Sequence, residues 1–71
     1  MWIMQEESTK LGSNLKKLRT RRNLSQGDVA LELKVSRGFI SMIENGKTNP
    51  TLLTISKLAK AVGVSSDELL K

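Results

Sequence analysis

Side chains suited to catalysis or metal binding are scarce in this sequence. It contains neither Cys nor His, so thiolate nucleophiles, imidazole proton shuttles and the commonest metal ligands are missing. Five carboxylates occupy positions that suit helix caps and helix faces: Asp28, Glu32, Glu44, Asp67 and Glu68. Their positions do not suggest convergence on one acid–base or metal site. We therefore predict no enzyme activity, no metal site and no cofactor.

The chemistry that the sequence does offer is cationic. Twelve Lys and Arg against seven Asp and Glu give a net charge of +5. Residues 8–47 carry nine cations and three anions, whereas residues 1–7 are net −2 and residues 48–71 are net +1. A basic domain attracts phosphate polyanions and gains affinity by releasing their counterions. Nucleic acid is therefore the first partner to consider, although many small basic domains bind nothing specific.

The elements that must position these cations are helices. The 71 residues show no repeat and no alternating strand pattern, and turn residues divide them into five short helical segments. We expect residues 8–71 to form a single all-α domain and residues 1–7 an N-terminal arm, in which Trp2 to Met4 stay unassigned. No apolar run approaches the roughly 20 residues that span a bilayer, and the start lacks a signal-peptide pattern, so we expect a cytoplasmic protein.

Local signals place the helix boundaries. The first helix carries its apolar face on Leu11, Leu15 and Leu18 and should end near Asn23. N-caps are predicted at Ser25, Ser36, Thr51 and Ser65, with Asp28 and Glu68 completing capping boxes. Gly46 and Gly63 should end the third and fourth helices in the left-handed conformation that Gly tolerates. The fourth helix is expected to bury one stripe, made of Leu52, Ile55, Leu58, Ala59 and Val62.

Two of these helices are joined by a very tight turn. Ala30 is small where the second and third helices should cross, and Val35 is expected to fill the turn. Ile40 should insert between the two helices. These spacings direct an exposed face of the third helix outward, where its first residues can enter a DNA major groove about 12 Å wide.

The segment 24–50, continued through 58–69, resembles the helix-turn-helix family of phage repressors and Cro. The resemblance implies a compact five-helix, lambda-repressor-like domain with the helix-turn-helix at its second and third helices. It also implies a sequence-specific transcriptional regulator that binds a palindromic operator as a homodimer, with a recognition helix at about Ser36–Asn45 in the major groove. Lys34, where relatives usually carry Gly, and Gly27, where they carry a charged helix former, should each cost roughly 1 kcal/mol.

The resemblance also implies which residues contact DNA. Base contacts are expected from Ser36, Arg37, Gly38, Ser41 and Met42. Arg37 is the leading base reader, because its guanidinium can donate two hydrogen bonds to guanine; a phosphate contact is the alternative. Phosphate contacts are expected from Ser25, Gln26, Asn45, Lys47, Thr48 and Asn49. Arg19 and Glu44 should form a structural ion pair, and Lys10, Lys16 and Arg21 a solvated basic face.

A dimer contact is expected near the C-terminus. Leu69 and Leu70 are adjacent, so on a helix they diverge by about 100° and one of them must cover another surface. Leu53 and Val64 are positioned to extend this apolar patch, so the expected dimer residues are Leu53, Val64, Leu69 and Leu70. The alternatives are that Leu70 is a frayed terminal residue with dimers forming only on DNA, or that the Trp2–Met4 arm makes the contact.

The sequence also allows other interpretations of the function. A protein-interaction module would need an apolar outer face on the third helix, and an RNA-binding protein would need more aromatic residues than Trp2 and Phe39. The stretch 36–41 is similar to restriction-modification controller proteins, with phage repressors, antitoxins and plasmid regulators as alternatives. RNA polymerase is a further candidate partner, whereas we expect no membrane contact and no small-molecule ligand.

Overall fold

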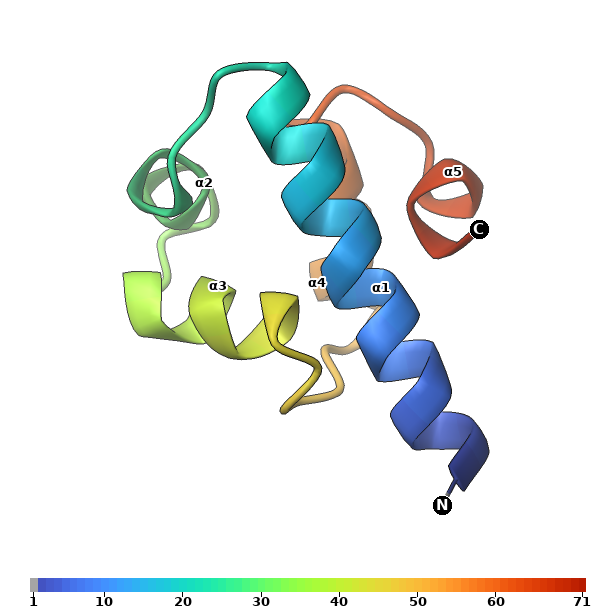
Figure 1. Ribbon diagram of the computed structural model, residues 1–71. Helices are drawn as coiled ribbons and strands as arrows, with labels where there is room; N and C mark the ends of the chain where they lie inside the picture. Colours follow the sequence, from blue (N-terminus) through green and yellow to red (C-terminus); the bar gives the residue numbers. More distant parts are fainter. Residues whose placement is uncertain (1) are drawn as a thin grey trace.

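Five helices follow one another along the chain in the computed structural model, which describes the backbone of residues 2–71 and the side chains of residues 7–71. They are α1 (Trp2–Arg21), α2 (Gln26–Leu33), α3 (Arg37–Glu44), α4 (Leu52–Ala61) and α5 (Ser66–Leu70). In Figure 1, α1 crosses the front of the molecule with α4 behind it, α2 and α3 on one side and α5 on the other. The described residues contain no strand, and the predicted all-α, five-helix class is confirmed.

Hydroxyl side chains start four of the helices, as predicted. Ser25 Oγ accepts from the Asp28 backbone N–H at 2.9 Å, and the Asp28 carboxylate accepts from the Ser25 N–H at 2.8 Å. The hydrogen bond from the Ser25 backbone N–H, followed by an interaction with the Ser25 side chain, lowers the pKa of the Asp28 carboxyl group. Ser36, Thr51 and Ser65 each accept from the backbone N–H three residues later. Each such cap satisfies a donor that the first helical turn leaves unpaired.

Residues with a positive φ follow the ends of the first four helices. Gly46 (φ 69°) and Gly63 (φ 75°) have the left-handed conformation predicted for them. Asn23 (φ 59°) follows α1, and Lys34 (φ 60°) is the C-cap of α2. Asn tolerates this conformation better than most residues, whereas Lys does not, so the strain expected at Lys34 is present.

The core gathers side chains from all five helices. Its fully buried larger members are Leu15, Val29, Ile40, Ile43, Leu58, Val62 and Leu69. α1 packs against α3 and α5, while α4 packs against α2 and α5. Gly12 marks the closest approach, because a Cβ there would lie 2.3 Å from the Ile43 carbonyl oxygen and 2.6 Å from that of Glu44. The absence of a side chain at Gly12 thus lets α1 lie directly against the end of α3.

Two apolar side chains differ from the sequence prediction. Leu52 is 81% exposed instead of buried, because it lies at the edge of the stripe centred on Ile55, Leu58 and Val62 and in the first turn of α4. Val35 is 36% exposed, so it is less buried than expected of a residue that fills the turn. Backbone hydrogen bonds also close the turn, including one of 3.0 Å from the Val35 N–H to the Ala30 carbonyl.

The backbone of residues 2–7 belongs to α1, whereas the sequence predicts a separate arm over residues 1–7. Gln5, Glu6 and Glu7 favour helix, and neither Gly nor Pro interrupts them. The side chains of Trp2 to Met4 lie outside the described residues, so the role given to that arm stays a prediction. Within the described residues, no helix combines the length and apolar character needed to span a membrane, and no cluster of metal-ligating side chains occurs.

Candidate nucleic-acid interface

α3 is anchored on one face and open on the other. Ile40 and Ile43 are fully buried, and Ser36 Oγ caps the helix by accepting from the Phe39 N–H at 3.1 Å. The residues expected to contact bases are exposed at Ser36, Arg37, Gly38 and Met42 and half-buried at Ser41. α3 with its two caps covers the predicted span from Ser36 to Asn45. The structure therefore brings these five residues to the start and the outer face of one rigidly held helix.

Glu44, at the end of α3, joins three parts of the chain. Its carboxylate accepts from Arg19 Nε at 2.6 Å and Nη2 at 3.1 Å, and from Gln26 Nε2 at 3.0 Å. Arg19 Nη1 also donates to the Leu24 carbonyl at 2.8 Å. The Glu44 side chain is only 2% exposed, and its hydrogen bond raises the pKa of Arg19 despite the opposing effect of burial. This network ties α1, the start of α2 and the end of α3 together.

The residues expected to contact phosphate fall into two groups that this network brings together. Ser25 and Gln26 begin α2, while Asn45, Lys47, Thr48 and Asn49 follow α3. The Gln26–Glu44 hydrogen bond holds the start of α2 next to the start of the α3–α4 loop. Arg37 lies seven residues before Glu44 on α3, which places the two residues about 10 Å apart along the helix axis. The amide and ammonium groups are thus at one end of α3 and the guanidinium at the other.

Contacts from α1 support the loop that follows α3. The buried Ser8 hydroxyl donates to Asn49 Oδ1. A Cβ on Gly46, which has a positive φ, would lie 3.0 to 3.1 Å from atoms of Thr9. Sequence reasoning missed these contacts and the Gln26–Glu44 bond, because no local pattern links positions 18 to 41 residues apart. The local sequence signal near these contacts was Gly46, which follows α3 and permits the left-handed turn beside Thr9.

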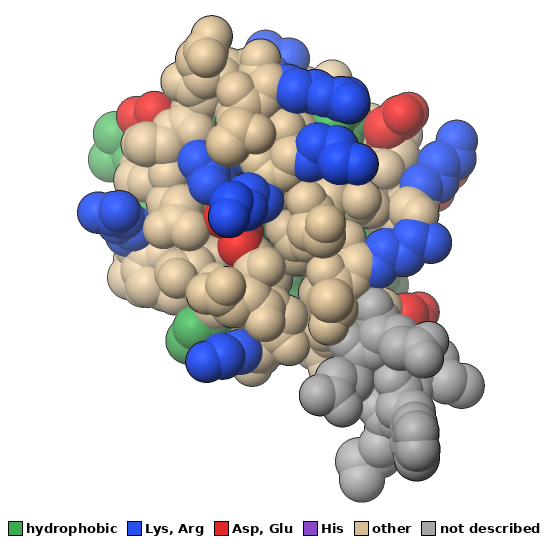
Figure 2. Space-filling view, viewed as in Figure 1, with side chains coloured by type: hydrophobic (Ala, Val, Ile, Leu, Met, Phe, Trp, Pro, Cys, Tyr) green, Lys and Arg blue, Asp and Glu red, His purple; other side chains and the backbone are tan. Residues whose placement is uncertain are grey.

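Figure 2 shows several separate basic side chains spread over the face of the molecule on which α1 lies. Lys10, Lys16 and Arg21 are all exposed on α1. Their solvation fits the predicted basic face, which would act on a polyanion through long-range attraction.

The expected dimer residues divide between core and surface. Leu69 is 0% exposed in the core, and its carbonyl accepts from Asn14 Nδ2 at 2.9 Å. Its assignment to a dimer surface is therefore wrong, because α5 turns this side chain onto its own chain. Leu53 and Leu70 are 66% and 43% exposed, and Val64 is half-buried against the core. Leu52, which also lines a groove with Leu70, joins the exposed set, and we call Leu52, Leu53 and Leu70 the leucine surface.

The sequence was compared with protein families and with known proteins. The helix-turn-helix family model HTH_3 matches residues 15–69. The chain is 40% identical over 60 residues to the uncharacterized HTH-type transcriptional regulator y4dJ of Sinorhizobium fredii, covering 84% of this chain and 78% of that one. It is 36% identical over 67 residues to control protein C.MunI of Mycoplasma sp, covering 93% and 90%.

A solved structure agrees in fold as well as in sequence. The restriction-modification controller protein C.AhdI from Aeromonas hydrophila superposes with a TM-score of 0.85 at 34% identity, covering 90% of this chain and 97% of that one. The family model matches from the middle of α1 to α5, so it includes the helix-turn-helix and the helices that hold it. The chain therefore belongs to the helix-turn-helix family HTH_3.

Proposed function

We propose that this protein is a sequence-specific transcriptional regulator that binds a palindromic DNA operator as a homodimer, with α3 in the major groove. The observation that carries the proposal is the contrast between the two faces of α3. Ile40, Ile43 and Glu44 fix the helix in the core, whereas Arg37, Gly38 and Met42 are exposed and unobstructed within the described residues. A polar, exposed and rigidly held helix of this kind suits direct reading of base edges.

The surroundings of α3 supply the remaining chemistry. Arg37 can donate to guanine from the start of the helix, while Gln26, Asn45 and Lys47 can hold a phosphate beside its end. Glu44 accepts one Gln26 N–H, which leaves the second N–H of that amide available to a phosphate oxygen. Contacts of this second type would fix the position of α3 without reading sequence.

A homodimer supplies the readout that one small domain lacks. One α3 reaches only a few base pairs, and a two-fold axis doubles this number on a palindrome. The leucine surface on α4 and α5 is the apolar area available for a second copy, and the net charge of +1 on residues 48–71 gives little repulsion. Similarity to C.MunI and C.AhdI favours a restriction-modification controller within the family. Contact with RNA polymerase stays a prediction.

A selection of genomic fragments by the purified protein tests the proposal directly. We expect the recovered fragments to share a palindromic motif whose half-sites are centred about 34 Å apart, one turn of B-DNA. The same selection with the Arg37→Ala variant should retain binding to DNA in general while losing information at one position in each half-site. Recovery of random fragments by the unmodified protein would contradict the sequence-specific function.

A further inference from the structure

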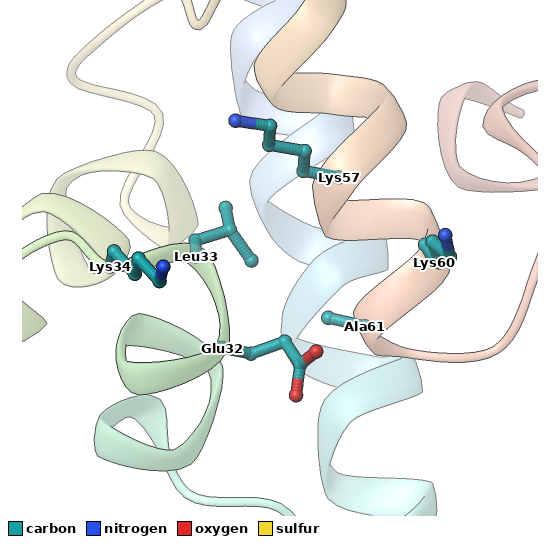
Figure 3. A pocket seen from close by; sticks show the side chains of 6 residues that line it. All are labelled: Glu32, Leu33, Lys34, Lys57, Lys60 and Ala61. Carbon is teal, nitrogen blue, oxygen red and sulfur yellow. The ribbon is translucent and has the colours of Figure 1, made fainter.

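A concave surface lies between the C-terminal end of α2 and α4, outside the candidate interface. It has a volume of about 270 Å³ and is lined by Glu32, Leu33, Lys34, Lys57, Lys60 and Ala61; we call it the lysine pocket. Figure 3 shows Lys34 on the α2 side and Lys57 and Lys60 on the α4 side, with Leu33 and Ala61 between them. Three lysines from two separate elements thus line one hollow.

The charges around the lysine pocket are not balanced. Three lysines and a single carboxylate, that of Glu32, line the pocket. Among the described residues the Arg19–Glu44 pair is the one ion pair with an N–O distance within 4 Å, so the lysines have no direct carboxylate partner. Lys34 and Lys60 lie at the C-terminal ends of α2 and α4, where the helix dipole stabilises a positive charge. Lys57 lies within α4, where that explanation does not apply.

We propose that the lysine pocket binds a small, multiply charged anion that carries phosphate groups. The charged residues of the lining sum to +2, which attracts an anion that carries several charges. The volume of about 270 Å³ lies just below the usual range of roughly 300 to 1,000 Å³ for small-molecule sites, so the pocket fits a compact ligand. This proposal replaces the expectation that the protein binds no small molecule.

The position of the pocket favours a free phosphate compound over a phosphate of the DNA backbone. The lysine pocket is at the C-terminal end of α2, whereas Ser25 and Gln26 begin that helix. The eight residues of α2 separate the two ends by about 12 Å. Anion binding at the lysine pocket therefore does not require the proposed DNA-binding function, and the two proposals can fail separately.

The pocket also adjoins the turn that leads to α3. Lys34 is the C-cap of α2, with φ 60° and ψ 43°, and only Val35 and Ser36 separate it from Arg37 at the start of α3. An anion that contacts Lys34 together with Lys57 or Lys60 would link this turn to α4. Binding should then stabilise the folded chain, because the ligand has no such site in the unfolded one.

Amide-resolved NMR of the full chain tests the proposal, with sodium pyrophosphate as the probe at constant ionic strength. We expect saturable shifts confined to residues 33–35 and 57–61. The double variant Lys57→Gln/Lys60→Gln should weaken the apparent affinity about fivefold or more. The matched control Lys16→Gln/Lys17→Gln removes the same charge from the exposed face of α1 and should leave the affinity unchanged.

Three results would overturn the proposal. Shifts that do not saturate, or an equal loss in the two double variants, would show general attraction to a basic protein. A DNA measurement separates the two sources of phosphate: if Lys57→Gln/Lys60→Gln lowers the salt slope for random duplex by about two while the control does not, the pocket holds backbone phosphate. Well-dispersed spectra would show that both double variants fold. Lys34→Gln should also weaken pyrophosphate binding, which tests the α2 side of the pocket independently.

Discussion

Arg37 and Lys47 carry the same charge but have different expected partners. Arg37 is exposed at the start of α3, and Lys47 is exposed in the loop after it. Arg37→Ala should flatten the preference at one base pair per half-site, a loss of about 1 to 3 kcal/mol of discrimination. Lys47→Ala should weaken binding to all sequences alike and lower the salt slope by about one.

Competition binding with operator and point-mutated operators measures both effects. Lys17→Ala is the matched control, because it removes one cation from the exposed face of α1. Full site preference in Arg37→Ala would show that Arg37 is not a base reader.

Arg19 and Glu44 should stabilise the fold as a unit. Truncating either residue to Ala should lower the free energy of unfolding by about 3 to 5 kcal/mol, because the partner stays largely buried without its counterion. In a double-mutant cycle followed by urea unfolding, the double variant should lose clearly less than the two single losses combined. Losses that simply add would show that the ion pair contributes no coupling.

At the scale of the helices, two positions hold a residue type that the local backbone conformation disfavours. Lys34 has φ 60°, so Lys34→Gly should raise the free energy of unfolding by about 1 kcal/mol. A Cβ on Gly27 would meet its nearest atom at 3.6 Å, and Gly27→Ala should add about 0.5 to 1 kcal/mol. Thermal or urea unfolding checks both variants. Gly46→Ala, where φ is 69° and Thr9 lies close, serves as the opposite control and should destabilise.

Gly12 should be required for the close contact between α1 and the end of α3. Gly12→Ala should lower the free energy of unfolding by about 1 to 3 kcal/mol, because the new methyl group would meet the Ile43 and Glu44 carbonyls and force the two helices apart. Gly38→Ala is the control, since its Cβ would have only Ser36 Oγ within 4 Å, at 3.9 Å. Equal unfolding midpoints for the two variants would contradict the close approach of α1 to α3.

The helices also show which parts of the structure the sequence could predict. Caps at Ser25 and Ser36 and the helix end at Gly63 follow from chemistry within a few residues, and the structure has them as predicted. The exposed Leu52 was misplaced because periodicity alone does not say how far a stripe extends toward the first turn of a helix. The role of Gly12 depends on which helix lies opposite, and no local pattern contains that information.

At the scale of the whole molecule, the candidate site was predictable in its residues but not in its internal contacts. The side chains expected at the site lie on and beside α3. The hydrogen bonds that organise them, from Gln26 to Glu44 and from Ser8 to Asn49, join distant positions and needed the fold. The same reason explains the wrong assignment of Leu69: adjacent leucines show that one must face outward, but not which one.

The leucine surface yields the last prediction, which concerns assembly. Leu53→Asp and Leu70→Asp should each weaken self-association, because a charge would be desolvated in an apolar contact between two copies. Leu31→Asp is the matched control, since Leu31 is also an exposed leucine but lies on α2. Analytical ultracentrifugation should show a dimer for the unmodified protein and for Leu31→Asp, and operator binding should fall together with the dimer. If Leu53→Asp and Leu70→Asp dimerise normally, the contact lies elsewhere, and the arm formed by Trp2 to Met4 becomes the segment to test. If the unmodified protein is monomeric at every concentration without DNA but binds its palindrome with two copies, the dimer forms only on the operator.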